Sequence, residues 1–258
     1  MRPMVVVVVF LLACEAGAAP PTLEELVAFA PAGSVTDTLS EDMRRNAMRT
    51  AAVGYAARAG LTRRGWEIAR ILERFAPQIG RVFRFRDLMI HEGGFLVQPP
   101  VLAETRQAFR LDRSLDRAAS AGRHLKIVAG ERILSGLPDW RDFLVRHWAG
   151  AEAPAAVLFP RDAAERELWR GWLEEGWKEG TDLADMIFLD DLERLTGFFE
   201  GLVLWHRLNR QRMVSAPVLS LQRSAVSGGG DVMRIDEALV TISARASFVA
   251  IPDLWRLP

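Results

Sequence analysis

The clearest pattern of hydrophobic and polar positions in the chain lies between residues 162 and 212. Apolar side chains recur there at spacings of three and four, which is the period of an amphipathic helix. The first stripe consists of Leu168, Trp169, Trp172, Leu173 and Trp177. Gly180 is expected to end this helix, and Asp182 to begin a second one. We place Trp169 and Trp172 in the core, because they share the apolar stripe.

Three earlier segments also predict helices. Residues 41–75 carry small and apolar side chains at helical spacing, interrupted by Gly60, so a helical hairpin or a kinked helix is expected. Residues 103–134 are mixed and polar, and we interpret them as helical. Pro138 ends that segment, and Asp139 is a suitable cap for a helix over residues 140–148.

Other patterns predict extended chain. Residues 83–85 and 95–97 are expected to form short strands, with a loop at Gly93-Gly94 between them. Residues 214–221 are expected to be extended, 228–231 to form a turn, and 232–235 and 239–243 to be strands. The sequence therefore predicts an α+β fold, mainly helical, with a small C-terminal antiparallel β-sheet packed on helices.

The N-terminus has the pattern of a bacterial export signal. Arg2 precedes an apolar run over residues 4–12, which is too short to cross a bilayer. Leu11-Leu12-Ala13-Cys14 fits the lipobox, in which Cys14 is acylated and becomes the new N-terminus; ordinary cleavage near residues 16–19 is the alternative. Glu15 stands where an aspartate would signal inner-membrane retention, so the expected location is the outer membrane, on its periplasmic face.

These signals divide the chain into three parts. Residues 1–13 are the predicted lipoprotein signal peptide, 14–40 a lipidated N-terminus and flexible tether, and 41–258 a single α+β domain. The tether contains a short apolar stretch, Leu23–Phe29, with room for one or two helical turns. Cys14 is the only cysteine, so an exported chain has no internal disulfide.

Charge gives no sign of a polyelectrolyte partner. The chain has 33 basic and 33 acidic residues, and its formal net charge is zero. Arg207, Arg210 and Arg212 form the densest basic cluster, and they fall at the end of a predicted helix, where the helix dipole favours cations. We therefore expect no direct binding of nucleic acid.

Catalytic and metal-binding motifs are missing from the sequence. His91, His124, His147 and His206 lack the spacing of metal ligands, and no Gly-x-Ser-x-Gly elbow occurs. The run Gly228–Asp231 lacks the lysine of a phosphate loop and predicts a hairpin turn. Adjacent carboxylates at 174–175 and 190–191 fit solvated helix faces. We expect no catalytic residues, no metal and no cofactor, and hence no enzyme.

Short motifs in a fixed order resemble a known family. They are Gly54, Gly60-Leu61, Arg63-Arg64, Pro99-Pro100-Val101, Glu104, Trp140-Arg141-Asp142-Phe143-Leu144, Pro160, Glu165, Trp169, Gly176-Trp177, Gly180, Ala184-Asp185, Leu192-Glu193-Arg194-Leu195, Phe198-Phe199-Glu200-Gly201-Leu202, Val214-Ser215-Ala216-Pro217 and Val240-Thr241-Ile242. With the lipobox, their order and spacing resemble the DotC family, called TraI-type in I-type conjugation systems. The match is loose over 111–136, and Thr181 and Trp205 depart from it.

The resemblance implies a non-enzymatic outer-membrane lipoprotein of a type IVB secretion or conjugation system. Such proteins help build the core complex beside a second small lipoprotein and an outer-membrane channel subunit, whose placement they assist. Cys14 is the only functional residue that the resemblance carries over. Two alternatives from other classes stay open at this point: a periplasmic hydrolase acting on cell wall or DNA, and a secreted binding module cleaved at Ala19.

Overall fold

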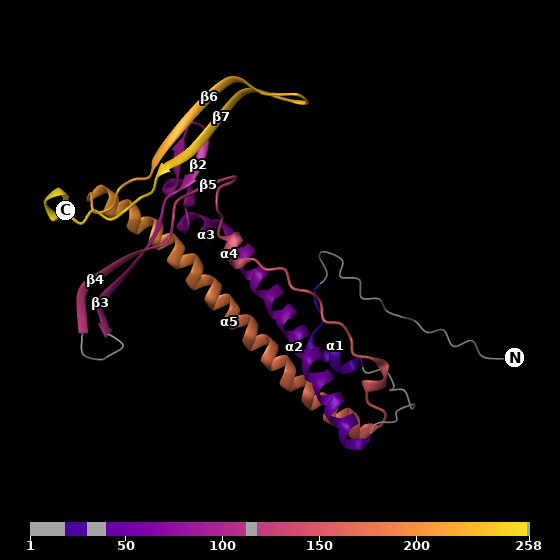
Figure 1. Ribbon diagram of the computed structural model, residues 1–258. Coiled ribbons are helices and arrows are strands. Elements are labelled where there is room, and N and C mark those ends of the chain that lie inside the picture. The colour runs from indigo at the N-terminus through magenta and orange to yellow at the C-terminus, as the bar shows by residue number, and fades with distance from the viewer. Residues whose placement is uncertain (1–18, 30–39, 112–117, 257–258) are drawn as a thin grey trace. The chain divides into compact units, whose positions relative to one another are not determined.

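The computed structural model describes residues 19–29, 40–111 and 118–256, and it divides the chain into two compact units (Figure 1). The first unit combines the chain up to Phe75 with Val145–Asp190, and the second combines Ala76–Leu144 with Asp191–Pro258. Side chains are described outside 108–119. The predicted signal peptide and Cys14 lie outside the described residues.

The first unit is helical. Its elements are α1 (Leu23–Ala28), α2 (Glu41–Arg74), the short 3-10 helix η2 (Ala156–Leu158) and the first part of α5 (Ala163–Arg210), which continues into the second unit. Ser40 caps α2 by accepting a hydrogen bond from the Met43 amide, and Glu41 and Asp42 lie in the first turn, where the helix dipole favours acidic residues.

Helices α2 and α5 run side by side in this unit (Figure 1) and meet through residues with little or no side chain. A Cβ at Gly60 would lie 2.6 Å from the Trp177 carbonyl oxygen, which is too close for any real contact. Cβ atoms at Gly176 and Gly180 would collide with the backbone of Val53 and Ala57. The two backbones can therefore approach this closely only because these three positions are glycine.

This contact corrects two sequence predictions. Gly180 does not end a helix and Asp182 does not begin one, because α5 is continuous over 48 residues. Gly60 does not divide 41–75 into a hairpin, because α2 is continuous over 34 residues. A helical glycine costs about 1 kcal/mol relative to alanine, and here close tertiary packing outweighs that cost.

The core of the first unit joins three helices. Trp169 and Leu173 of α5 pack with Ala52 and Ala56 of α2, and all four are buried. Leu26 of α1 is buried in the same cluster, so this part of the predicted tether packs on the unit. Trp169 is in the core as predicted, and Trp172 is partly buried against the same cluster.

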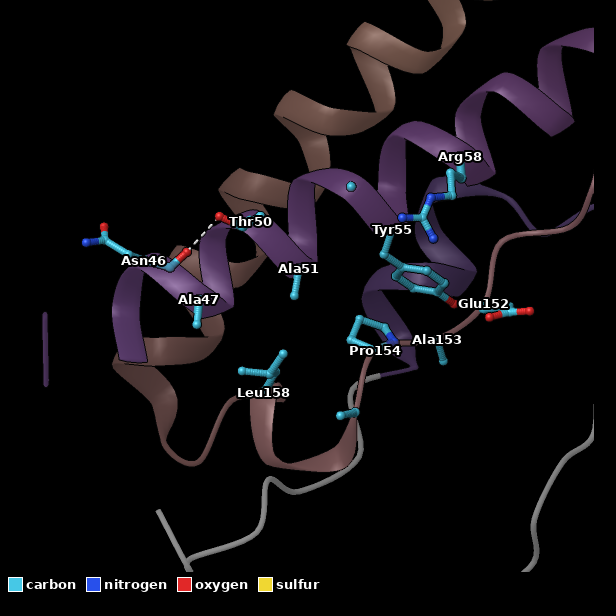
Figure 2. A pocket seen from close by; sticks show the side chains of 12 residues that line it. Asn46, Ala47, Thr50, Ala51, Tyr55, Arg58, Glu152, Ala153, Pro154 and Leu158 are labelled. Atoms are coloured by element: carbon cyan, nitrogen blue, oxygen red, sulfur yellow. Dashed lines mark hydrogen bonds between the residues drawn. The ribbon is translucent and has the colours of Figure 1, made fainter. Parts of the chain in front are cut away.

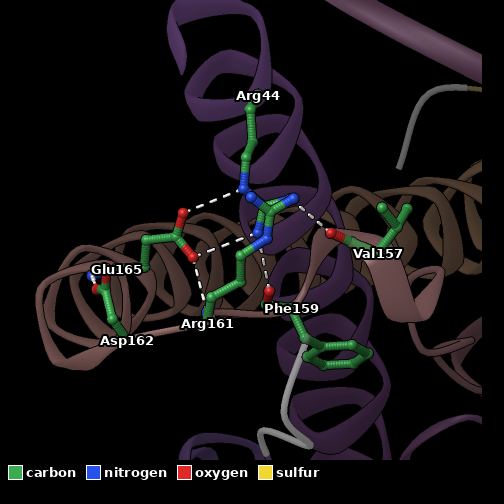
Figure 3. A network of polar contacts seen from close by, with 6 residues as sticks. All are labelled: Arg44, Val157, Phe159, Arg161, Asp162 and Glu165. Carbon is green, nitrogen blue, oxygen red and sulfur yellow. Dashed lines mark hydrogen bonds and ion pairs between the residues drawn. The ribbon is translucent and has the colours of Figure 1, made fainter. Parts of the chain in front are cut away.

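An ion pair between the buried Arg44 and the partly buried Glu165 fixes the start of α5 against α2 (Figure 3). The Arg44 guanidinium donates to both Glu165 carboxylate oxygens, at 3.1 and 3.2 Å, and to the carbonyl oxygens of Val157 and Phe159, at 2.7 and 3.2 Å. Glu165 also accepts from the Arg161 amide, and Asp162 caps the helix by accepting from the Glu165 amide. Each charge therefore has several hydrogen-bond partners, as a buried pair requires.

The second unit mixes helices with three antiparallel sheets. Its elements are α3 (Ala76–Val82), η1 (Phe85–Leu88), β1 (Ile90–Glu92), β2 (Phe95–Gln98), β3 (Val101–Leu111), β4 (Ala118–Ala129), β5 (Arg132–Leu134), α4 (Arg141–Leu144), the later part of α5, β6 (Val218–Gly229), β7 (Val232–Ala244) and η3 (Pro252–Leu254). The sheets are β1-β2-β5, β3-β4 and β6-β7. The fold class is α+β, as predicted, with a C-terminal antiparallel sheet.

Several local predictions need correction in this unit. The described residues within 103–111 and 118–134 lie mainly in strands β3, β4 and β5 instead of a helix, and Phe85 begins a 3-10 helix instead of lying in a strand. Residues 95–97 are extended as predicted. Asp139 does accept a hydrogen bond from the Arg141 amide at a helix start, but α4 ends at Leu144. The two predicted C-terminal strands are one strand, β7.

Two clusters of packed side chains, each with a buried centre, hold the second unit together. Phe85 lies among Phe143, Phe198 and Phe199, with ring centroids 5.6 to 6.1 Å from its own. Leu102 of β3 packs with Trp205 and Leu208 of α5 in the other cluster. The residues of α5 from Phe198 onward therefore support both the aromatic cluster and the β3–β4 hairpin.

Alanine usually stabilises a helix relative to glycine, but the close contact of α2 and α5 predicts the opposite at the contact positions. We expect Gly176→Ala to lower the free energy of unfolding by about 1–3 kcal/mol, because the added methyl group forces the helices apart. Gly171, also in α5, is the matched control, since a Cβ there meets nothing within 4 Å. Gly171→Ala should raise stability by up to about 1 kcal/mol. Urea unfolding distinguishes the two, and equal shifts would contradict this account of α2 and α5.

The Arg44–Glu165 pair predicts a pH dependence. The hydrogen bond from Arg44 is the main cause that lowers the Glu165 pKa below its ordinary 4.5, against partial burial, which raises it. A lowered folded-state pKa stabilises the protein above the unfolded value, and this stability is lost as the pH falls through the folded value.

We therefore expect wild-type stability to fall more steeply between about pH 5 and pH 3 than that of Glu165→Gln. Glu175→Gln is the control, because its ion pair with Arg49 is exposed and contributes little. Parallel curves for wild type and Glu165→Gln, measured by urea unfolding, would rule out the pair as the source.

Candidate functional site

The histidines that were considered as metal ligands do not lie together in one site. Cys14, the one predicted site residue, lies outside the described residues. His91, His124 and His147 are exposed, while the Nε2 atom of His206 lies 3.0 Å from the Leu88 carbonyl oxygen. In the described ranges, no group of three or more histidine, cysteine, aspartate or glutamate side chains is placed to hold a metal ion. The histidines are thus dispersed over separate elements.

A recess of about 650 Å³ opens on the first unit (Figure 2). One wall is α2, with Ala47, Ala51 and Tyr55, and the other is the segment 152–158. Burial raises the Tyr55 pKa, so its hydroxyl keeps its proton. The lining contains the hydroxyls of Thr50 and Tyr55 and the carboxylate of Glu152, and the Thr50 hydroxyl donates to the Asn46 carbonyl oxygen at 3.0 Å.

The β6–β7 hairpin exposes large apolar side chains. Val226 and Ile235 are direct cross-strand partners, and Met233 lies next along the same face, opposite Gly228. Met233 is 69 % exposed and Ile235 65 %. Among the described strands, β6 and β7 pair only with each other, so both outer edges are open. Exposed apolar side chains and open strand edges are typical of surfaces that bind another protein.

A second candidate surface surrounds Glu104 of β3. Its carboxylate accepts a hydrogen bond from Arg123 at 2.6 Å and one from Arg207 of α5 at 3.3 Å, and Arg106 lies 3.7 Å away. We call these four residues the arginine cluster. The Arg123 hydrogen bond is the main cause that lowers the Glu104 pKa, against burial, which raises it. The cluster therefore holds three guanidinium groups around one ionised carboxylate.

This arrangement is costly for the hairpin that carries it. Arg106 and Arg123 are direct cross-strand partners, and like charges in that position are destabilising. The next residue, Gln107, has a φ of 52°, in the left-handed region that favours glycine. Functional sites often contain features that are unfavourable for local stability. The like-charge pair and the left-handed Gln107 therefore make the cluster a candidate for binding.

Sequence reasoning missed the arginine cluster because it interpreted residues 103–134 as a helix. A helix there would separate Arg123 from Glu104, whereas the hairpin brings them together. One signal could have identified the strand: Leu125 and Ile127 are partly buried and alternate with the exposed His124, Lys126 and Val128. Arg207 lies in the last turn of α5, as predicted, and its ionic partner Glu104 comes from β3.

Removing the carboxylate tests the electrostatics of the cluster. We expect Glu104→Gln to lower the free energy of unfolding by about 1–2 kcal/mol, because three cations then lose their common partner. Adding Arg106→Gln should recover part of that loss, and high salt should reduce the difference by screening. Urea unfolding at two salt concentrations measures both effects. No recovery in the double variant would mean that Arg106 is not under repulsion.

Comparison with known proteins places the chain in a family. None of the described helices has the length and apolarity needed to cross a membrane, and no curated protein matches the chain in sequence. Residues 42–257 match the family model T4SS_TraI, described as "Type IV secretory system, conjugal DNA-protein transfer". The match covers the first unit from residue 42 onward, without α1, and the second unit up to residue 257. The chain therefore belongs to this family of type IV secretion and conjugal transfer components.

Proposed function

We propose that the chain is a non-enzymatic lipoprotein that helps build the outer-membrane core complex of a type IVB secretion or conjugation system. Acyl chains on Cys14 anchor it to the periplasmic face of the outer membrane. Its partners are other core subunits, namely a second small lipoprotein and the outer-membrane channel subunit whose placement it assists. Nucleic acid is not a direct ligand in this proposal.

The observation that carries this proposal is the exposed β6–β7 hairpin. Its apolar face around Val226, Met233 and Ile235 would favour aggregation if it stayed open to water, and a partner protein would remove it from water. The open edges of the hairpin can also pair with a strand from another chain. Both features suit a subunit of an assembly.

Lipidation supports durable attachment without a membrane-spanning helix. Each buried methylene of an acyl chain contributes about 0.8 kcal/mol, and two or three chains together give stable anchoring. The lipobox Leu11-Leu12-Ala13-Cys14 motivates this part of the proposal. The alternative of a periplasmic hydrolase has weaker support, because the Thr50 hydroxyl in the recess beside Tyr55 donates to the Asn46 carbonyl oxygen and not to a base.

The native size of the particle extracted by mild detergent from outer membranes tests the proposal. We expect wild type in a very large assembly that contains a channel subunit, and Cys14→Ser mislocalised and absent from it. Met233→Asp should stay anchored but leave the assembly, because a charge on the hairpin opposes burial. Met186→Asp is the matched control, since Met186 is similarly exposed on α5.

Two results would contradict the proposal. A small monomer without partners, unchanged by Cys14→Ser, would oppose both the anchor and the scaffold role. If Met233→Asp assembles at wild-type levels, the hairpin does not make the assembly contacts, whatever the outcome for Cys14.

A further inference from the structure

A groove of about 540 Å³ lies in the second unit between α5 and the start of β3. Its apolar part is lined by Phe199, Val203 and Leu204 of α5, and the exposed Glu200 lies on the same stretch of the helix. A smaller recess of about 310 Å³ adjoins it and shares Glu104 and Arg207 with it. The two recesses thus form one continuous surface, mainly apolar along the helix apart from Glu200 and positively charged at the arginine cluster.

The charged end of this groove has an excess of positive charge. Three guanidinium groups face one carboxylate, so two positive charges lack an acidic partner within the cluster. Arg106 is 81 % exposed in its side chain, and about half of the Arg207 side chain is exposed. A guanidinium has five N–H donors in a planar fork that suits a carboxylate. Donors therefore remain for a ligand with negative charge.

The groove is open where a ligand would lie. Gly197 of α5 lines it, and a Cβ at that position meets nothing within 4 Å. Gly201, one turn further, is different, because a Cβ there would collide with Val101 and Leu102 of β3. Gly201 thus lets the strand approach the helix, while Gly197 leaves free space beside the apolar lining.

We propose that this groove binds an acidic peptide segment of a partner protein, in which an apolar side chain lies next to two carboxylates. The apolar side chain occupies the groove beside Val203, and the carboxylates bind Arg106 and Arg207. The linings of the two recesses together hold three arginines, Glu104 and Glu200, which leaves an excess of one positive charge that a ligand carboxylate neutralises, and the second carboxylate uses the remaining donors of the exposed Arg106. The same ligand would relieve the repulsion between the paired arginines Arg106 and Arg123.

A peptide fits these features better than nucleic acid does. The positive excess is confined to one end of the groove, whereas a nucleic-acid backbone needs basic residues along its whole path. The net charge of the chain is zero. The proposal rests on the scaffold function in one respect: the partner is taken to be another core subunit.

The test uses the full-length chain, purified in mild detergent, against a displayed library of random peptides. We expect the selected peptides to carry two or more aspartate or glutamate residues next to an apolar one. Fluorescence anisotropy then gives the dissociation constant of each labelled peptide. Replacing its acidic residues by asparagine and glutamine should weaken binding by about tenfold or more, because charge-assisted hydrogen bonds are lost.

Variants of the groove provide matched controls. Arg106→Gln and Arg207→Gln should each weaken binding by about tenfold, and Gly197→Leu should also weaken it by filling the groove. Gly171→Leu is the control, because it adds the same side chain to another open position of α5. Circular dichroism checks that each variant stays folded.

Three results would overturn the proposal. The selected peptides could lack acidic residues, or Arg106→Gln and Gly197→Leu could bind them as tightly as wild type does. Binding of a single-stranded oligodeoxynucleotide with the same dependence on Arg106, without peptide binding, would assign the cluster to phosphate instead. Peptide binding is measured on the purified chain alone. It can therefore be absent while the particle size still supports the scaffold function, and it can be present while the particle size contradicts that function.

Discussion

The close approach of α2 and α5 is the constraint on which the first unit depends. Gly60, Gly176 and Gly180 have no side chain where the two backbones meet. Because the helices lie so close, Ala52 and Ala56 can contact Trp169 and Leu173 and form a core from small and large residues together. The Arg44–Glu165 pair then fixes one end of this helix pair, where η2 and α5 begin.

The second unit depends on α5 in a different way. From Phe198 onward the helix contributes to the aromatic cluster around Phe85, and further along to the cluster with Leu102. These contacts hold the base of the β3–β4 hairpin, while much of β6–β7 stays exposed. The unit therefore combines a packed base with extended hairpins, which is an arrangement suited to binding other subunits.

The sequence predicted the fold class and the C-terminal hairpin, because alternation at Val240 and Ile242 and the glycine turn are local signals. It failed at Gly180, since a glycine that permits tertiary contact looks the same in sequence as one that ends a helix. It also failed over 103–134, where the alternation around Leu125 and Ile127 is short and the other residues are mixed and polar. The arginine cluster could not be predicted, because Glu104, Arg123 and Arg207 meet only through tertiary structure. The lipidation of Cys14 stays a prediction.

The central claim is that this family member joins its assembly through the exposed hairpin of its second unit. Hydrogen–deuterium exchange followed by mass spectrometry tests it most directly, by comparing the purified chain with the chain in the detergent-extracted particle. The account predicts slower exchange in the particle for peptides from Val218–Ala244, with the buried parts of α2 and α5 little changed. Equal exchange of the hairpin in both states would contradict it.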